Sequence, residues 1–208
     1  MPTCPTSSTY CAAAPRRRPT PTLLHRFGDW AVHDTEILDA LEALVQTTAA
    51  DDTLAIAAAV TATRLGADPH PALRLLEHHL TNTGRHLEEA ARLGPAAAPL
   101  LPLIERHLDN GNSRYRLHAA EAHFNITDDP SVTAPVLTAL LDPMGPVGVN
   151  TLQTLRRIGP PHPPHLQPRL LHWATSERRL MSEDTIWIHG RRQHLDNQLR
   201  ETAHRMLT

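Results

Sequence analysis

The sequence predicts an all-α fold, and three observations lead to that prediction. Apolar residues make up 40% of the 208 residues and are mostly Ala and Leu, while aromatic residues make up only 3%, a composition that favours packing of helix on helix over sheets. Apolar positions recur at intervals of three and four, which is the period of a helix with one buried face. Gly-containing breaks divide these stretches at regular intervals, which indicates an α-solenoid of about five αα-hairpins.

The breaks share one pattern, in which Arg, then Leu or Ile, then Gly ends an apolar stretch and Pro follows within a few residues. The pattern occurs at 64–66, 92–94 and 157–159. Its glycines are 28 and then 65 residues apart, and the second interval is about two repeat lengths, with Ile126-Thr127 standing where another copy is expected. Gly is favoured just after the end of a helix and Pro in the first turn of the next, so each copy separates two helices.

Helices can be assigned along the chain from these breaks and from the capping residues. Asp34 or Thr35 is placed to cap the first helix, whose apolar face runs from Ile37 to Val45, and Asp51-Asp52 can cap a second helix that ends at Gly66. The remaining helices are expected at about 70–80, 84–94, 97–108, 113–126, 132–142, 147–158, 164–175 and 194–207.

Two segments fall outside the repeat pattern. Residues 1–22 are rich in Pro and Thr and have little apolar surface to bury, so we expect a disordered tail that precedes a repeat domain at 23–208. Cys4 and Cys11 both lie in this tail, so the predicted core does not depend on a disulfide. The second segment is a long insertion at about 176–194, in which 185–189 could be extended and Gly190 could form a turn. It could cap the end of the array or bind a ligand.

A series of motifs in the middle of the chain carries a family resemblance. They are 93–103 (LGPAAAPLLPL), Arg116, 119–122 (AAEA) and 126–130 (ITDDP). These motifs resemble HEAT-like repeat proteins, in particular those of actinobacteria, closely from about 90 to 141 and more loosely from 54 to 208. The resemblance implies a right-handed solenoid whose second helices line a concave surface for protein contact. It also implies hydrogen bonding between repeats that involves Asp109 and Arg116.

Composition and motifs give no support for catalysis, a metal or a cofactor. Fifteen histidines are present, but the chain has no His-Glu-x-x-His motif, no His-Glu dipeptide and no paired-cysteine motif, so we expect histidines at the surface, with His123 partly buried. No stretch approaches the roughly 18 consecutive apolar residues of a membrane span, and the N-terminus lacks the basic-then-apolar pattern of a signal peptide. We therefore expect a cytoplasmic, non-enzymatic protein without membrane contact.

The resemblance and the helix pattern together predict a non-catalytic scaffold that binds a protein partner through its concave face. The candidate contact residues are those expected to point outward from the second helices: Arg85, Glu88, Arg114, His118, Glu121 and Asn150.

An alternative is a nucleic-acid-binding module, similar to HEAT-like DNA glycosylases, centred on the C-terminal region. Seven Arg and five acidic residues lie between 169 and 205, and Trp187, Arg191 and Arg192 are the candidate contacts there. The formal net charge of −2 gives no general support to this alternative. Trp173 lies on an apolar stripe and is expected in the core.

Overall fold

A computed structural model describes residues 20–29, 34–47, 52–141, 146–160, 162–177, 186–188, 191–193 and 195–208. Helices form most of this described part, so the all-α prediction is confirmed. The helices are α1 (Pro21–Asp29), α2 (Thr35–Thr47), α3 (Asp52–Arg64), α4 (His70–Asn82), α5 (Leu87–Leu93), η1 (Gly94–Leu100), α6 (Leu101–Leu108), α7 (Ser113–Thr127), α8 (Pro130–Ala139), α9 (Pro146–Ile158), α10 (Leu166–Thr175) and α11 (Leu195–Leu207).

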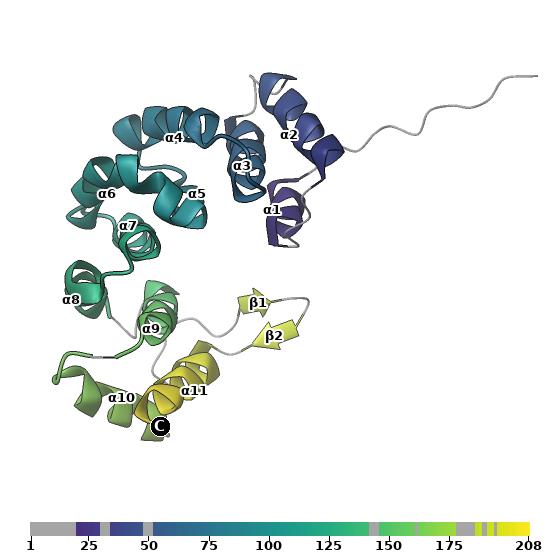
Figure 1. Ribbon diagram of the computed structural model, residues 1–208. Coiled ribbons are helices and arrows are strands. Elements are labelled where there is room, and N and C mark those ends of the chain that lie inside the picture. Colours follow the sequence, from purple (N-terminus) through teal and green to yellow (C-terminus); the bar gives the residue numbers. More distant parts are fainter. Residues whose placement is uncertain are drawn as a thin grey trace, which may run out of the picture.

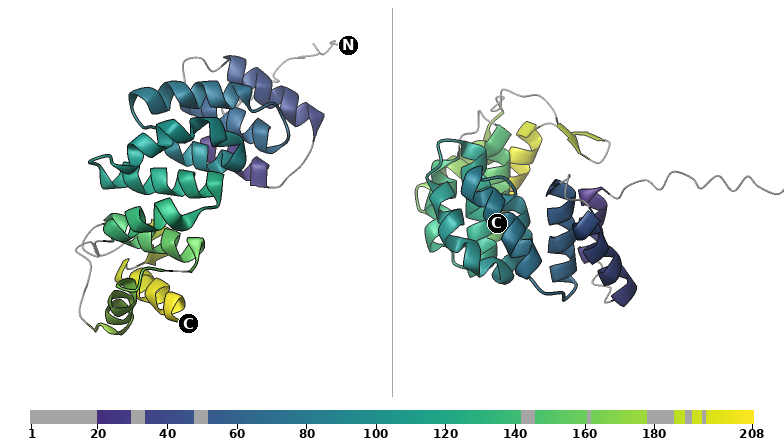
Figure 2. Two further views of the ribbon diagram at one scale, coloured as in Figure 1. Left: turned by 60° about the vertical axis from the view of Figure 1, so that its left-hand side comes forward. Right: turned by 90° about the horizontal axis from the view of Figure 1, so that it is seen from above.

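The helices follow one another along a curved path (Figure 1). Helices α4, α6, α8 and α10 lie on the outer side of the curve, and α5, α7, α9 and α11 lie on its inner side. Helix α3 contacts both α1 and α2, α7 contacts α5, α6, α8 and α9, and α11 contacts both α9 and α10. Figure 2 shows the same stack from two further sides, with α10 and α11 at the opposite end from α1 and α2.

The predicted Gly breaks are confirmed by the backbone. Gly66, Gly94 and Gly159 have φ angles of 103°, 58° and 80°, a region that L residues with a Cβ rarely adopt. The helix expected at 97–108 begins differently, as the 3₁₀ helix η1, and becomes α-helical only at Leu101. Three prolines in 95–102 lack the N–H that α-helical hydrogen bonds require, which explains the irregular start.

Helix α1 was not expected from the sequence, because the apolar pattern begins only after Asp34. Pro21 stands at its first residue, where the missing N–H has no cost, and Leu24 is buried with 4% exposure. Two side-chain contacts hold the helix to the stack: His25 Nε2 lies 2.9 Å from Glu89 Oε1, and Asp29 Oδ1 forms an ion pair with Arg64 Nη1 at 3.0 Å. The predicted boundary at 22/23 therefore falls within the first turn of α1, while 1–19 lie outside the described residues.

The insertion between α10 and α11 contains two short strands, β1 (Ile186–Ile188) and β2 (Arg191–Gln193), which pair antiparallel with Trp187 opposite Arg192. The sequence predicted the extended segment at β1. Residues 178–185, 189–190 and 194 of the insertion lie outside the described part of the structure.

One apolar core runs through the stack from Ile56 in α3 to Ala203 in α11. A smaller cluster joins α1, α2 and the other face of α3, so that every residue from Leu54 to Ala62 is buried. Trp173 is 3% exposed, as its position on the apolar stripe predicts, and His123 is 5% exposed. Among the described helices, none is both long and apolar enough to cross a membrane.

Side chains also bond to the carbonyl ends of neighbouring helices. Arg116 Nε donates to the Leu108 carbonyl at 3.0 Å, so Arg116 bonds to the end of α6. Arg169 on α10 donates to the Leu141 carbonyl beyond α8. His107 Nε2 lies 3.0 Å from the Leu80 carbonyl, to which it donates across two neighbouring outer helices. These contacts satisfy carbonyls that the helix ends leave without partners.

The lack of a side chain at Gly84 leaves room for the His107 ring that bonds to the Leu80 carbonyl. We expect Gly84→Ala to lower the free energy of unfolding more than the same substitution at Gly159. Gly84 has φ +64°, and a Cβ there would lie 2.7 Å from Cε1 of the His107 ring. Gly159 has φ +80°, but no described atom lies within 4 Å of its added Cβ, so Gly159→Ala is the matched control. We expect Gly159→Ala to cost roughly 1 kcal/mol of unfolding free energy from backbone strain alone, and Gly84→Ala about 1–2 kcal/mol more.

Urea unfolding of both variants measures this difference. Equal losses in the two variants would show that the His107 ring moves aside without cost and that its bond to Leu80 contributes little.

Candidate functional site

Three adjoining hollows lie along the inner helices, and together they form what we call the inner groove. The largest, of about 900 Å³, lies between α7, α9 and α11, the second, of about 540 Å³, lies by the N-terminal ends of α5 and α7, and the third, of about 320 Å³, lies between α5, α7 and α9. His118 lines all three hollows, so they adjoin one another at this side chain. The lining is mostly polar.

All six contact residues predicted on the second helices line this groove. They lie just before α5 (Arg85), on α5 (Glu88), on α7 (Arg114, His118 and Glu121) and on α9 (Asn150). The helical period placed them on a common face, and the stacking of the inner helices brings those faces together. Trp187 lies on β1, and Arg191 and Arg192 lie on β2, but their side chains lie outside the described part of the structure.

Several lining residues were not predicted. On α9 they are Gln153, Thr154, Arg156 and Arg157, and on α11 they are Gln198, Glu201, Thr202 and Arg205. Gln153, Thr154 and Arg157 could have been found from Asn150, because intervals of three, four and seven residues fall on the same helical face, whereas Arg156 is six residues on and does not follow from this interval. The α11 residues gave no such signal, since the insertion breaks the repeat interval before them.

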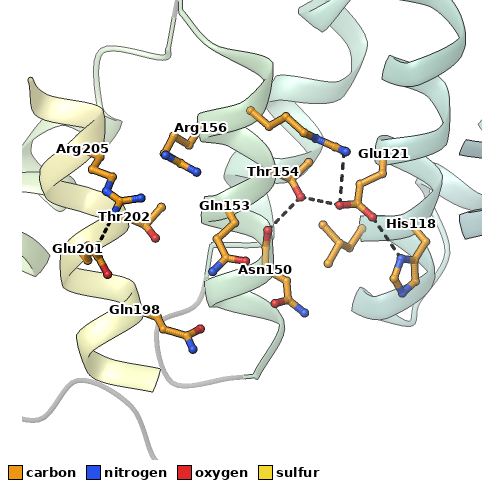
Figure 3. Close-up of a pocket in the computed structure, with 12 residues that line it drawn as sticks. His118, Glu121, Asn150, Gln153, Thr154, Arg156, Gln198, Glu201, Thr202 and Arg205 are labelled. Atoms are coloured by element: carbon orange, nitrogen blue, oxygen red, sulfur yellow. Dashed lines mark hydrogen bonds and ion pairs between the residues drawn. The ribbon is translucent and has the colours of Figure 1, made fainter. Parts of the chain in front are cut away.

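A network of polar contacts at the centre of the groove joins α5, α7 and α9. His118 Nε2 lies 3.0 Å from Glu88 Oε1, and His118 Nδ1 lies 3.3 Å from Glu121 Oε2. Thr154 Oγ1 donates to Glu121 Oε1 at 2.6 Å, and Arg157 Nη2 lies 3.7 Å from the same oxygen (Figure 3). Glu121 therefore connects α7 to α9, while His118 connects α7 to α5.

Glu121 is held in its charged form by these neighbours. Burial of the carboxylate opposes ionisation, but the hydrogen bonds from His118 and Thr154 outweigh this effect, and the charges of His118 and Arg157 add to them. The pKa of Glu121 consequently lies below its ordinary value. A carboxylate that stays ionised and accepts contacts from two helices is suited to fixing their arrangement.

The histidines of the described part do not gather into a metal centre. No group of three or more His, Cys, Asp or Glu side chains among the described residues is arranged to hold a metal ion. The two ring nitrogens of His118 face the carboxylates of Glu88 and Glu121. These carboxylates occupy the positions in which a metal ion would bind the ring.

Comparison with known proteins finds no protein-family model, no curated protein and no solved structure that matches the chain. The function is therefore inferred from the residues and geometry of the chain itself.

The low pKa of Glu121 predicts how stability depends on pH. Because the folded pKa lies below that of the unfolded chain, near 4.3, the contribution of the charged group is fully present above that value and is lost as the pH falls through the folded pKa. We expect Glu121→Gln to lower the unfolding free energy by about 1–2 kcal/mol near pH 7, and this gap to narrow below about pH 4.5.

The measurement is urea unfolding of the wild type and Glu121→Gln over a pH series. Glu88→Gln is the control, because the Glu88 side chain is 54% exposed and a contact of an exposed charge contributes little. A gap between the wild type and Glu121→Gln that stays constant in acid would contradict the role given to the charged form.

Proposed function

We propose that the chain is a HEAT-like α-solenoid of about five αα-hairpins, and that it acts as a non-catalytic scaffold that binds a protein partner in the inner groove. The alternation of outer and inner helices supports the repeat assignment (Figure 1). Contacts between successive inner helices also recur at similar sequence separations. Asn125 bonds to the Ala91 carbonyl 34 residues earlier, and Thr154 bonds to Glu121 33 residues earlier. Such spacing is expected where equivalent positions of neighbouring repeats meet.

The observation that carries the binding proposal is the composition and extent of the inner groove. Its lining comes from four successive inner helices, and includes exposed side chains such as Arg85, Arg114, Asn150 and Gln153. A polar groove that runs along several repeats suits an extended polypeptide, as concave solenoid surfaces generally do. The two titratable residues at its centre, His118 and Glu121, are engaged in contacts between helices, which favours a structural role for them over a catalytic one.

The described C-terminal residues add no support to the nucleic-acid alternative, whose candidate contacts Trp187, Arg191 and Arg192 have side chains outside the described part of the structure. Trp173 is buried, so its ring is not available to stack on a base. Arg169 lies over the Trp173 ring, 5.0 Å from its centroid, and also donates to a carbonyl. Arg205 pairs with Glu201, and Arg200 lies 3.6 Å from Asp196. These described C-terminal arginines are therefore already engaged within the chain.

Substitutions in the groove should abolish partner capture. The groove variant is Arg85→Ala/Arg114→Ala/Asn150→Ala, which removes three exposed side chains and leaves the Glu121 contacts intact. The control is Arg74→Ala/Arg106→Ala/Gln167→Ala, which changes exposed positions on the outer helices α4, α6 and α10. We expect the immobilised groove variant to retain less than about a tenth of the partner that the wild type captures from lysate, and the control to retain most of it.

Quantitative mass spectrometry of the captured proteins provides the measurement. The proposal would be wrong if the groove variant and the wild type captured the same proteins in the same amounts.

A further inference from the structure

The carboxylates that line the inner groove are already paired within the chain. Glu88 lies 3.0 Å from His118, and Glu89 lies 2.9 Å from His25 of α1. Glu121 accepts from Thr154, and Glu201 pairs with Arg205. Each of these carboxylates thus already has a polar partner within the chain, and for Glu121 and Glu201 an arginine is among the partners.

Three arginines that line the same groove differ from these carboxylates in having no such partner among the described residues. Arg85, Arg114 and Arg156 are exposed, and none of them lies within ion-pair distance of a carboxylate among the described residues. Figure 3 shows Arg156 on α9 with no dashed contact, although Glu121 has several and Glu201 has one. By contrast, Arg157 and Arg205 both contact a carboxylate of the chain. Within the described part of the chain, the groove therefore presents three exposed guanidinium groups that have no ion-pair partner.

These arginines are spread along the groove and are accompanied by amides. Arg85 precedes α5, Arg114 lies in the first turn of α7, and Arg156 lies in the last turn of α9. Asn150 and Gln153 are exposed on α9 and line the same hollow as Arg156. A side-chain amide can both donate to and accept from a peptide backbone, while a guanidinium can bind a carboxylate through two parallel hydrogen bonds.

We propose that the inner groove recognises an extended acidic peptide, whose carboxylates bind Arg85, Arg114 and Arg156 and whose backbone bonds to the amides of α9. This inference rests on the proposed function and names the chemistry of the partner. Charge complementarity supports it, because the unpaired lining groups are cationic although the whole chain has a formal net charge of −2. A nucleic-acid duplex is less suited to the groove, since proteins that bind duplexes commonly neutralise about six to ten phosphates.

Fluorescence anisotropy with synthetic peptides tests the inference on the full chain. The probes are a fluorescein-labelled peptide of alternating Glu and Ser, about 15 residues long and so roughly 50 Å when extended, and a matched peptide of Lys and Ser. The groove variant is Arg114→Glu/Arg156→Glu. The control is Arg74→Glu/Arg106→Glu, which makes the same change in net charge on the outer helices, with Arg106 also in the last turn of its helix.

We expect the wild type to bind the Glu/Ser peptide, and this binding to weaken as salt is raised. The groove variant should bind the Glu/Ser peptide about tenfold or more weakly and should gain affinity for the Lys/Ser peptide, because two of the three cations now carry the opposite charge. The outer-helix control should keep the wild-type affinity within about twofold, since its altered charges lie on the other side of the stack.

The inference would be overturned by equal loss in the two charge-reversed variants, by the absence of any preference for the acidic peptide, or by tighter binding of a fluorescein-labelled DNA duplex that the groove variant abolishes. The proposed function can fail separately. If partner capture depends on the groove while the Glu/Ser peptide does not bind, the groove still binds a protein but the acidic chemistry is wrong. If capture is unaffected by the groove substitutions, both proposals fail.

Discussion

The burial of apolar side chains of each helix against its neighbours is the constraint on which the rest of the structure depends. One buried core runs from Ile56 to Ala203 and takes side chains from successive helices along the chain. Helix α3 shows the consequence most clearly. It is buried on both faces from Leu54 to Ala62, and the small Ala side chains at five of these nine positions let neighbouring helices approach it from two sides.

Packing of apolar stripes does not by itself fix how one inner helix is placed along the next, and polar contacts supply that placement. Thr154 on α9 bonds to Glu121 on α7, and Asn125 on α7 bonds to the Ala91 carbonyl on α5. Each contact needs a particular alignment of the two helices, because hydrogen bonds weaken rapidly with distance and angle. The same contacts lie beside or within the inner groove, so the groups that set the arrangement of the helices also determine the shape of the candidate site.

The sequence predicted the helices where local residues determine them. The ends of α3 and α9 follow from Gly66 and Gly159, whose positive φ angles are a property of the residue type, and α4, α7 and α11 begin and end close to the expected residues. Helix α1 was missed because its stability comes from tertiary contacts, including that between His25 and Glu89, which no local pattern reveals. The 3₁₀ start of η1 was missed because the apolar period continues through prolines that change the hydrogen bonding.

The position of the candidate site could be predicted from the sequence, but which of its charged side chains have partners could not. Helical periodicity places Arg85, Glu88, Arg114, His118, Glu121 and Asn150 on one face, and all six line the groove. Which carboxylates have a partner depends on the groups that each side chain meets in the folded chain: Glu88 meets His118, 30 positions away on another helix, whereas Glu201 pairs with Arg205 on the same helix.

The formal net charge of the whole chain therefore says little about the electrostatic potential in the inner groove. Much of the negative charge lies away from the groove, as on α2, which carries Glu36, Asp39 and Glu42 and no basic residue. Charges separated by more than about 8–10 Å are largely screened at physiological salt, so acidic residues on other helices do little to offset an exposed guanidinium in the groove. A partner that reaches Arg85, Arg114 or Arg156 responds to the groups within that distance, and the nearby carboxylates Glu88, Glu121 and Glu201 are already engaged by His118, Thr154 and Arg205.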